Sequence, residues 1–304
     1  MYNNVRIRAI LHRMPDNLRR GGKKNFMSKE RRATLYVFAS AVLFSIGGLC
    51  VKVIPWSGIT INGVRSLISV LILLVYFKIT GHKFVFNKSV ALGAVSMAGT
   101  TTLYCLANKL TTAANTIILQ FTAPVFIILF MWAFFHERPK KLDICTSLVV
   151  LTGIVFFFVD SLAAGNTLGN LLALLSGVCY AGVFMMNTFP GADSLSSILL
   201  GQAICAVTQT PFIFDENVFT QTAVIAAVVL GVFQLAMAYI FMSKGLEHTP
   251  AIAASLTSAV EPILNPIWVA VFYHEMISGL SFVGAVIVFI GVIGYNLLKL
   301  RADG

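Results

Sequence analysis

The sequence contains few charged residues: Asp, Glu, Lys and Arg make up 11% of its 304 residues, and only 12 residues are acidic. A soluble globular domain carries about 25% charged residues, so this composition excludes an ordinary soluble protein. Hydrophobic residues instead make up 58% of the chain, and its mean hydropathy is +0.86. The sequence is therefore predicted to be an all-α integral membrane protein.

The sequence also lacks the short motifs of several enzyme classes. It has no GxxxxGK[ST] loop, so direct ATP drive is not expected. Two His-Glu dipeptides occur, His136-Glu137 and His274-Glu275, but neither continues into HExxH, and a zinc hydrolase is not supported. The cysteines form no CxxC pair and are read as reduced packing residues; they are Cys50, Cys105, Cys145, Cys179 and Cys205. We predict no cofactor and no metal.

Ten hydrophobic stretches are long enough to cross a bilayer, which takes about 17–25 helical residues. They are separated by short loops and leave no room for a soluble domain. Weak separation around the third to fifth stretches, and between the eighth and ninth, leaves nine spans as an alternative. The ten stretches are 34–54, 58–79, 89–108, 113–135, 142–160, 168–188, 194–214, 222–243, 250–273 and 279–299.

The net charge of +10 arises from basic residues whose placement argues against nucleic-acid binding. Ten of the 22 Lys and Arg residues precede residue 33. If the N-terminus is cytoplasmic, nineteen basic residues fall on the inner side, whereas only Lys52 and Lys109 fall near the outer side. This positive-inside asymmetry predicts a multi-pass protein of the cell membrane, a bacterial inner membrane, with both termini in the cytoplasm.

The first 33 residues form a basic cytoplasmic tail that has three interpretations. Apolar residues at helical spacing from Ile7 to Leu18 would suit an interfacial helix, although Pro15 interrupts it. The segment is also basic and poor in acids, as an organellar transit sequence is. Alternatively, translation starts at Met27 and not at Met1.

An internal repeat relates the two halves of the chain. Residues 111–137 align without a gap to residues 249–275, an offset of 138, with six identities in 27 positions. Five spans in each half is an odd number, so the second half enters the membrane from the opposite side. The prediction is two inverted five-helix repeats, 34–160 and 168–300, as in transporters whose site lies between repeats.

The repeated spans resemble those of the EamA-type, ten-helix branch of the drug/metabolite transporter superfamily. The similarity is carried by Ala113-Ala114 and Ala251-Ile252, by Thr122-Ala123-Pro124 and Val260-Glu261-Pro262, and by Glu137 and Glu275. Arg65 early in the second span also suits that family. The resemblance covers about 30–300 and implies a bundle with a central cavity, alternating access, and export or uptake of small metabolites.

The ninth span carries the residues from which a site is predicted. Ser258, Glu261, Asn265 and Trp268 share one helical face, and Glu261 lies near the bilayer midplane. A carboxylate inside a membrane marks a functional site by default. The first half has alanine at the equivalent position, so the repeated fold does not require a carboxylate there. This favours a functional role for the carboxylate.

Three prolines interrupt the backbone hydrogen bonding of the repeated spans: Pro124, Pro262 and Pro266. Each removes one donor, so the carbonyl four residues earlier loses its helical partner. Two interpretations remain: a kink required for packing, or a broken helix that lines a cavity.

Arg65 enters the second span from the outer side and has three candidate roles. It would form a buried pair with Glu261. Alternatively it receives a substrate carboxylate, while burial favours the neutral form of Glu261 and lets that residue carry a coupling proton. In the third interpretation Arg65 extends back to the outer interface.

The remaining candidates for substrate binding are Tyr104, Gln120 and Tyr180, which would supply cavity walls and hydrogen bonds. The sequence thus predicts a secondary transporter for an amino-acid-like or other amphipathic metabolite, with the lipid bilayer and protons as further partners. A homodimer is compatible with it. A non-transporting scaffold or sensor, and a membrane-embedded enzyme, are the alternatives; no span offers a catalytic constellation.

Overall fold

The computed structural model describes residues 16–111, 113–158, 166–264, 267–268 and 279–303, and all regular structure in these ranges is helical. The first half contains α2 (Asp16–Phe44), α3 (Gly47–Val53), α4 (Gly58–Thr80), α5 (Lys88–Leu110), α6 (Ala113–Gln120), α7 (Ala123–Phe135) and α8 (Lys141–Phe158). The second half contains α9 (Thr167–Phe184), α10 (Ser194–Gln209), η2 (Thr210–Asp215), α11 (Gln221–Val229), η3 (Leu230–Met237), α12 (Ala238–Leu246), α13 (Ala251–Ser258) and α15 (Gly279–Asp303).

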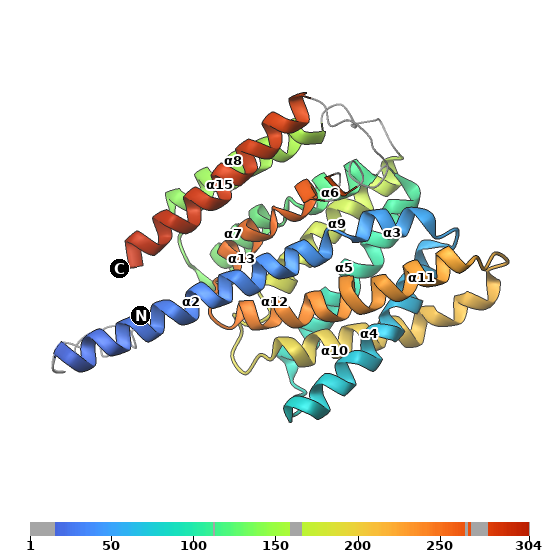
Figure 1. Cartoon of the computed structure of the whole chain (residues 1–304), viewed down its shortest axis with the longest axis horizontal. Helices are drawn as coiled ribbons and strands as arrows, with labels where there is room; N and C mark the ends of the chain where they lie inside the picture. Colours follow the sequence, from blue (N-terminus) through green and yellow to red (C-terminus); the bar gives the residue numbers. More distant parts are fainter. Residues whose placement is uncertain (1–15, 112, 159–165, 265–266, 269–278, 304) are drawn as a thin grey trace.

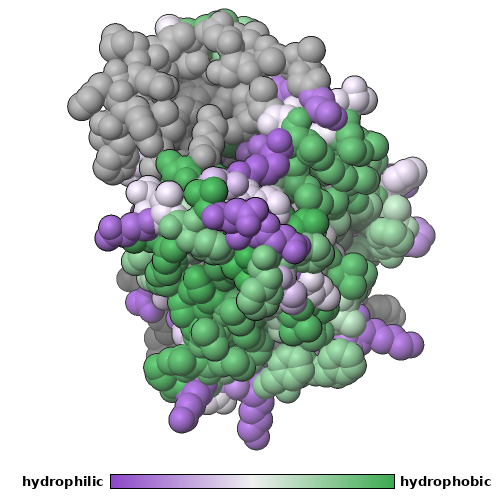
Figure 2. Space-filling model, turned by 90° about the vertical axis from the view of Figure 1, so that its right-hand side faces the viewer, coloured by the Kyte–Doolittle hydropathy of each residue, from purple (hydrophilic) through white to green (hydrophobic). Residues whose placement is uncertain are grey.

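Each of the ten predicted hydrophobic stretches contains helix in the described residues. Among the described residues, six helical segments are long and apolar enough to cross a membrane, and two shorter apolar helices span Ala251–Leu264 and Phe282–Leu298. The prediction of an all-helical membrane protein is therefore confirmed, whereas the number of ten spans stays a prediction. In the face shown in Figure 2, hydrophobic residues cover most of the surface and hydrophilic residues form smaller patches.

Polar side chains at the ends of the apolar stretches set where the helices begin. Ser57, Asn87, Asn166, Asp193 and Thr220 each accept a hydrogen bond from a backbone N–H in the first turn of the following helix. Such caps satisfy donors that have no partner inside the helix. The loops between spans can therefore be short without leaving buried backbone groups unpaired.

The first helix begins earlier than the predicted span at residue 34. Within the described residues, α2 extends from Asp16 and continues into the apolar stretch. The predicted interfacial helix around residues 7–18 lies mostly outside the described residues.

The helices of three predicted spans are interrupted near their centres. The first breaks at Ser45–Ile46, the fourth at Phe121–Thr122 and the ninth at Ala259–Val260. The last two breaks lie 138 residues apart, the offset of the sequence repeat, and each is followed within three residues by a proline. η3 adds a π-helical segment to the eighth span. Such segments are frequently found at functional sites.

Helix contacts recur between the two halves. α5 packs against α9 and α2 against α12, and α6 contacts α9 as α13 contacts α2. Contacts between α4 and α10, between α7 and α13, and between α8 and α15 join equivalent helices of the two halves. If each helix is replaced by its counterpart in the other half, each of these contacts becomes either itself or another contact of the same set. Figure 1 shows α8 and α15 side by side, apart from the remaining helices.

Small residues allow the two halves to approach closely. A Cβ atom at Gly63 in α4 would lie 2.4 Å from the backbone carbonyl carbon of Gln209 at the end of α10. Glycine is required there because any side chain would push the two backbones apart. This contact holds α4 and α10 together next to the site described below.

Candidate functional site

A small cavity lies where helices from both halves meet at the breaks. Its volume is about 20 Å³, which is enough for one water molecule and too small for a metabolite. Its walls come from α2, α4, α5, α6, α9, η3, α12 and the turn after α13. The lining residues are Phe44, Arg65, Thr100, Thr101, Tyr104, Gln120, Tyr180, Gln234, Leu235, Tyr239 and Glu261.

Arg65 is the most deeply buried charged side chain of the site, with 1% of its surface exposed. Its Nε and Nη2 atoms donate to Asn62 Oδ1 at 3.1 and 3.0 Å, and Nη2 also donates to the Thr101 carbonyl at 3.4 Å. Nη1 donates to Gln234 Oε1 at 3.1 Å. All of these acceptors are neutral, so the positive charge is held in place without being neutralised.

Four of the five N–H groups of Arg65 thus have partners among the described residues. A guanidinium has five donors in a fixed planar arrangement, which leaves one N–H on Nη1 for a further acceptor. Asn62 is itself fixed, because its Nδ2 donates to Gln209 Oε1 at 2.8 Å and to Thr102 Oγ1 at 3.2 Å. The orientation of Arg65 is therefore determined by neighbouring helices before any ligand arrives.

Glu261 begins the short helical turn that follows the break in the ninth span, and it lines the same cavity. Its Oε2 atom is buried, and no described residue donates a hydrogen bond to it. Tyr180 lines the same cavity. No ion pair joins Glu261 to Arg65. Of the three interpretations of Arg65, the structure thus shows neither the pair nor a side chain that extends to the interface.

Aromatic rings form much of the cavity wall. The Phe44 and Tyr239 rings meet edge to face with centroids 4.7 Å apart, and Phe121 and Tyr180 do so at 6.1 Å. Tyr104 completes the aromatic lining. A cavity that combines apolar walls with a few oriented polar groups is typical of a small-molecule site.

Gln120 ends α6 directly before the break in the fourth span. Its Nε2 atom donates to Ser176 Oγ at 3.0 Å, and Ser176 in turn donates to the Thr100 carbonyl at 3.2 Å. Pro124 lies in the first turn of α7. The break thus places Gln120 on one side of the cavity while Pro262 follows Glu261 on the other, so both interruptions border the site.

Of the remaining predicted site residues, Ser258 and Trp268 are described and are not part of the cavity lining. Ser258 is fully buried, and no described residue is a hydrogen-bond partner of its hydroxyl. Trp268 donates from Nε1 to Ser45 Oγ at 2.8 Å, at the break of the first span. Asn265 and Pro266 lie outside the described residues. Arg65, Tyr104, Gln120, Tyr180 and Glu261 are the predicted residues that the structure brings together.

Several lining residues are absent from the candidates that the sequence predicts. They are Phe44, Thr100, Thr101, Gln234, Leu235 and Tyr239. A run of three threonines, Thr100 to Thr102, is the one local pattern that would have drawn attention to the third span. Within the described part of the chain, no group of three or more His, Cys, Asp or Glu residues is placed to hold a metal ion.

Comparison with known families gives a match over most of the chain. The sequence profile of the EamA-like transporter family matches residues 31–159 and again residues 167–297. The two matches lie in the two halves that the helix contacts relate.

Similarity to individual proteins agrees with this match. The chain is 28% identical over 214 residues to the uncharacterized transporter YwfM of Bacillus subtilis, covering 67% of this chain and 71% of that protein. It is 23% identical over 190 residues to the pseudopaline exporter CntI of Pseudomonas aeruginosa, covering 61% and 66%. A crystal structure with 19% identity superposes with a TM-score of 0.74, over 88% of this chain and 97% of that one, which shows a shared fold.

Proposed function

Because the chain belongs to the EamA-like transporter family, we propose that it is a secondary transporter that moves a small organic metabolite across the cytoplasmic membrane by alternating access. The observation that carries the proposal is the central cavity, which both halves line and which holds one oriented cation and one carboxyl group that do not pair. Unpaired charges inside a membrane protein are costly and mark a substrate or ion site.

The substrate that fits this arrangement is amino-acid-like. The remaining N–H of Arg65 suits a carboxylate, and the unpartnered Oε2 of Glu261 suits an ammonium group or a proton. The rings of Tyr104, Tyr180 and Tyr239 would contact an apolar portion of the molecule. Since the cavity now holds about 20 Å³, the two halves must separate before a substrate enters.

Direction and coupling form the finer part of the proposal. The similarity to a pseudopaline exporter favours export. Glu261 would exchange the coupling proton, because burial favours the neutral form of a carboxyl group while an approaching cation favours the ionised form.

The membrane arrangement proposed with this function is ten spans in two inverted repeats, 34–160 and 168–300. It is supported by the recurring helix contacts and by the equal offset of the breaks in the fourth and ninth spans. The start of α2 and the end of α15 lie on the same side of the molecule in Figure 1. Together with the placement of basic residues, this favours both termini in the cytoplasm of a bacterial cell. A homodimer remains a prediction.

The first experiment is metabolite profiling of cells and medium with and without expression of the protein, followed by uptake into proteoliposomes. A small set of related amino-acid-like compounds that moves between cell and medium would identify the substrate class and direction. No reproducible difference despite verified membrane expression would contradict the metabolite-carrier proposal and favour the scaffold or sensor.

The Glu261→Gln variant tests coupling in the same proteoliposomes. The amide keeps the size of the side chain but cannot release a proton, so pH-driven transport should be lost while substrate exchange at equal pH remains. The matched control is Glu247→Gln, an exposed carboxylate after α12 outside the cavity, which should leave both activities unchanged. Retained pH-driven transport in Glu261→Gln would refute proton coupling through this residue.

A further inference from the structure

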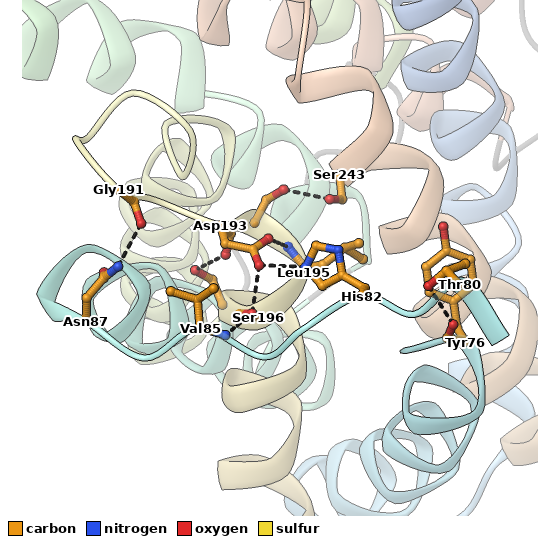
Figure 3. Close-up of polar contacts among 12 residues, drawn as sticks. Tyr76, Thr80, His82, Val85, Asn87, Gly191, Asp193, Leu195, Ser196 and Ser243 are labelled. Atoms are coloured by element: carbon orange, nitrogen blue, oxygen red, sulfur yellow. Dashed lines mark hydrogen bonds and ion pairs between the residues drawn. The ribbon is translucent and has the colours of Figure 1, made fainter. Parts of the chain in front are cut away.

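Two sets of polar contacts lie at opposite ends of α4, outside the cavity. The first, which we name the Asp193 latch, joins the loop after α4 to the segment before and at the start of α10. His82 Nε2 lies 2.7 Å from Asp193 Oδ2, and the Val85 N–H donates to Ser196 Oγ at 3.0 Å. Asn87 Nδ2 donates to the Gly191 carbonyl at 2.7 Å. Figure 3 shows these side chains converging from the two segments.

The second set, which we name the Glu216 latch, joins the start of α4 to the segment that includes η2. The Ser57 N–H donates to Glu216 Oε1 at 2.7 Å, and Thr60 Oγ1 donates to the Phe212 carbonyl at 3.3 Å. Trp56 Nε1 donates to the Val218 carbonyl at 2.8 Å. α4 has 23 residues, so the two latches are about 35 Å apart along its axis, the thickness of a bilayer.

The two latches are equivalent under exchange of the halves. Asp193 caps the N-terminus of α10 and Ser57 caps the N-terminus of α4. Asp193, which caps α10, contacts the segment after α4, and Ser57, which caps α4, contacts the segment after α10. The same connection is thus made once at each end of the α4–α10 pair.

Each latch depends on a charged group in a partly exposed position. Asp193 also accepts hydrogen bonds from the Leu195 N–H and the Ser196 hydroxyl. Burial pushes the pKa of Glu216 upward, but hydrogen bonds from Ser57 and Thr60 outweigh this effect and hold the pKa below its usual value. Partly exposed polar contacts of this kind are weak enough to break and re-form reversibly.

We propose that the Asp193 latch and the Glu216 latch are the two alternating gates of the transporter, a proposal that rests on the proposed transport function. In the structure described here the contacts of both latches are formed, which agrees with a cavity volume of only about 20 Å³. Transport would open one latch while the other holds the opposite face shut. His82, Asp193, Ser57 and Glu216 are then positioning residues that set which face is open, without contacting the substrate.

The test measures access to the cavity from each face of the membrane. A single cysteine replaces Thr100, a cavity-lining residue, in a chain without its native cysteines, and a membrane-impermeant maleimide is applied to intact cells or to inside-out vesicles. Asp193→Asn retains the helix cap but removes the carboxylate that contacts His82. We expect it to raise labelling about threefold from the face that carries Asp193, the population shift produced by losing one partly exposed polar contact.

Glu216→Gln should raise labelling from the opposite face of the membrane, the face that carries Glu216. Two conservative variants keep the test decisive if a carboxylate variant fails to fold. Ser89→Ala removes the bond to the Pro190 carbonyl, a further contact between the two segments of the Asp193 latch. Trp56→Phe keeps an aromatic ring and removes the bond to the Val218 carbonyl in the Glu216 latch. Lys83→Gln and Asp215→Asn are controls. Both residues are exposed and take no part in the contacts that define either latch, so these variants should leave labelling unchanged.

Each outcome bears on one proposal. Side-specific labelling changes support the gates even if no substrate is found, in which case the transport proposal alone fails. The gate proposal is wrong if labelling changes equally from both faces, or if it changes in none of the four latch variants. Transport measured in proteoliposomes would still support the proposed function in that case.

Discussion

At the scale of single residues, the unusual feature is a buried cation whose partners are all neutral. Three acceptors hold Arg65, namely Asn62 Oδ1, the Thr101 carbonyl and Gln234 Oε1. A buried ion pair would have neutralised this charge and left little for a ligand to recognise. Because Arg65 and Glu261 form no ion pair, the cavity contains a cation that no carboxylate neutralises and a carboxyl oxygen without a described hydrogen-bond donor.

Arg65→Lys should destabilise the protein although the charge is retained. An ammonium is not a planar fork and cannot reach Asn62, Thr101 and Gln234 together, so at least one buried acceptor loses its donor. The expected loss is about 1–3 kcal/mol of unfolding free energy, measured by thermal unfolding in detergent. An unchanged unfolding temperature would indicate that the hydrogen bonds around Arg65 contribute little to stability.

A substitution of Gln202 in α10 should stabilise the protein. The side chain is fully buried, and no described residue bonds to its amide nitrogen or oxygen. Methionine has a similar volume to glutamine, and Gln202→Met removes two buried polar atoms. We therefore expect the free energy of unfolding to increase by about 1 kcal/mol or more. The same thermal assay would show a higher midpoint. A lower midpoint would mean that a bound water or ligand normally pairs with Gln202.

At the scale of helices, interruptions determine where the site forms. The breaks at Phe121–Thr122 and Ala259–Val260 place Gln120 and Glu261 at the cavity. An uninterrupted helix would direct both side chains according to a fixed rotation of 100° per residue, which follows from about 3.6 residues per turn. The breaks remove that constraint and free backbone groups that only a cavity or a neighbouring helix can satisfy.

Pro262→Ala should therefore separate stability from function. Alanine favours a helix interior over proline by about 3 kcal/mol, so the unfolding temperature should stay the same or rise as the break closes. Transport should fall because Glu261 then turns away from Arg65. Pro250→Ala is the control, since Pro250 precedes α13 and lies outside the break. Undiminished transport in a stable Pro262→Ala protein would show that the interruption is only a packing kink.

At the scale of the whole molecule, two related halves enclose the site and are joined at both ends of α4. The helix contacts are nearly invariant to exchange of the halves, but the charges are not: Glu261 has Ala123 as its counterpart. A symmetric frame with an asymmetric site suits a protein that alternates between two similar conformations yet binds one substrate.

Sidedness of the molecule can be measured directly. Lys83→Cys and Asp215→Cys both place a thiol at an exposed position beside opposite latches. The placement of basic residues predicts that the first reacts with an impermeant reagent only in inside-out vesicles and the second only in intact cells. Reaction of both from the same side would contradict the proposed topology.

The sequence by itself determined the class of the protein, its helical composition and its family, because hydropathy and repeat spacing are local properties that lipid selects for. It also identified Arg65, Tyr104, Gln120, Tyr180 and Glu261 as candidates. Only the tertiary structure decided that they share one cavity and that Arg65 bonds to Asn62 and Gln234 instead of Glu261. Trp268 likewise bonds to Ser45 outside the cavity lining. These outcomes depend on the rotation of each helix and on the geometry of each break, which are set by packing between helices distant in sequence.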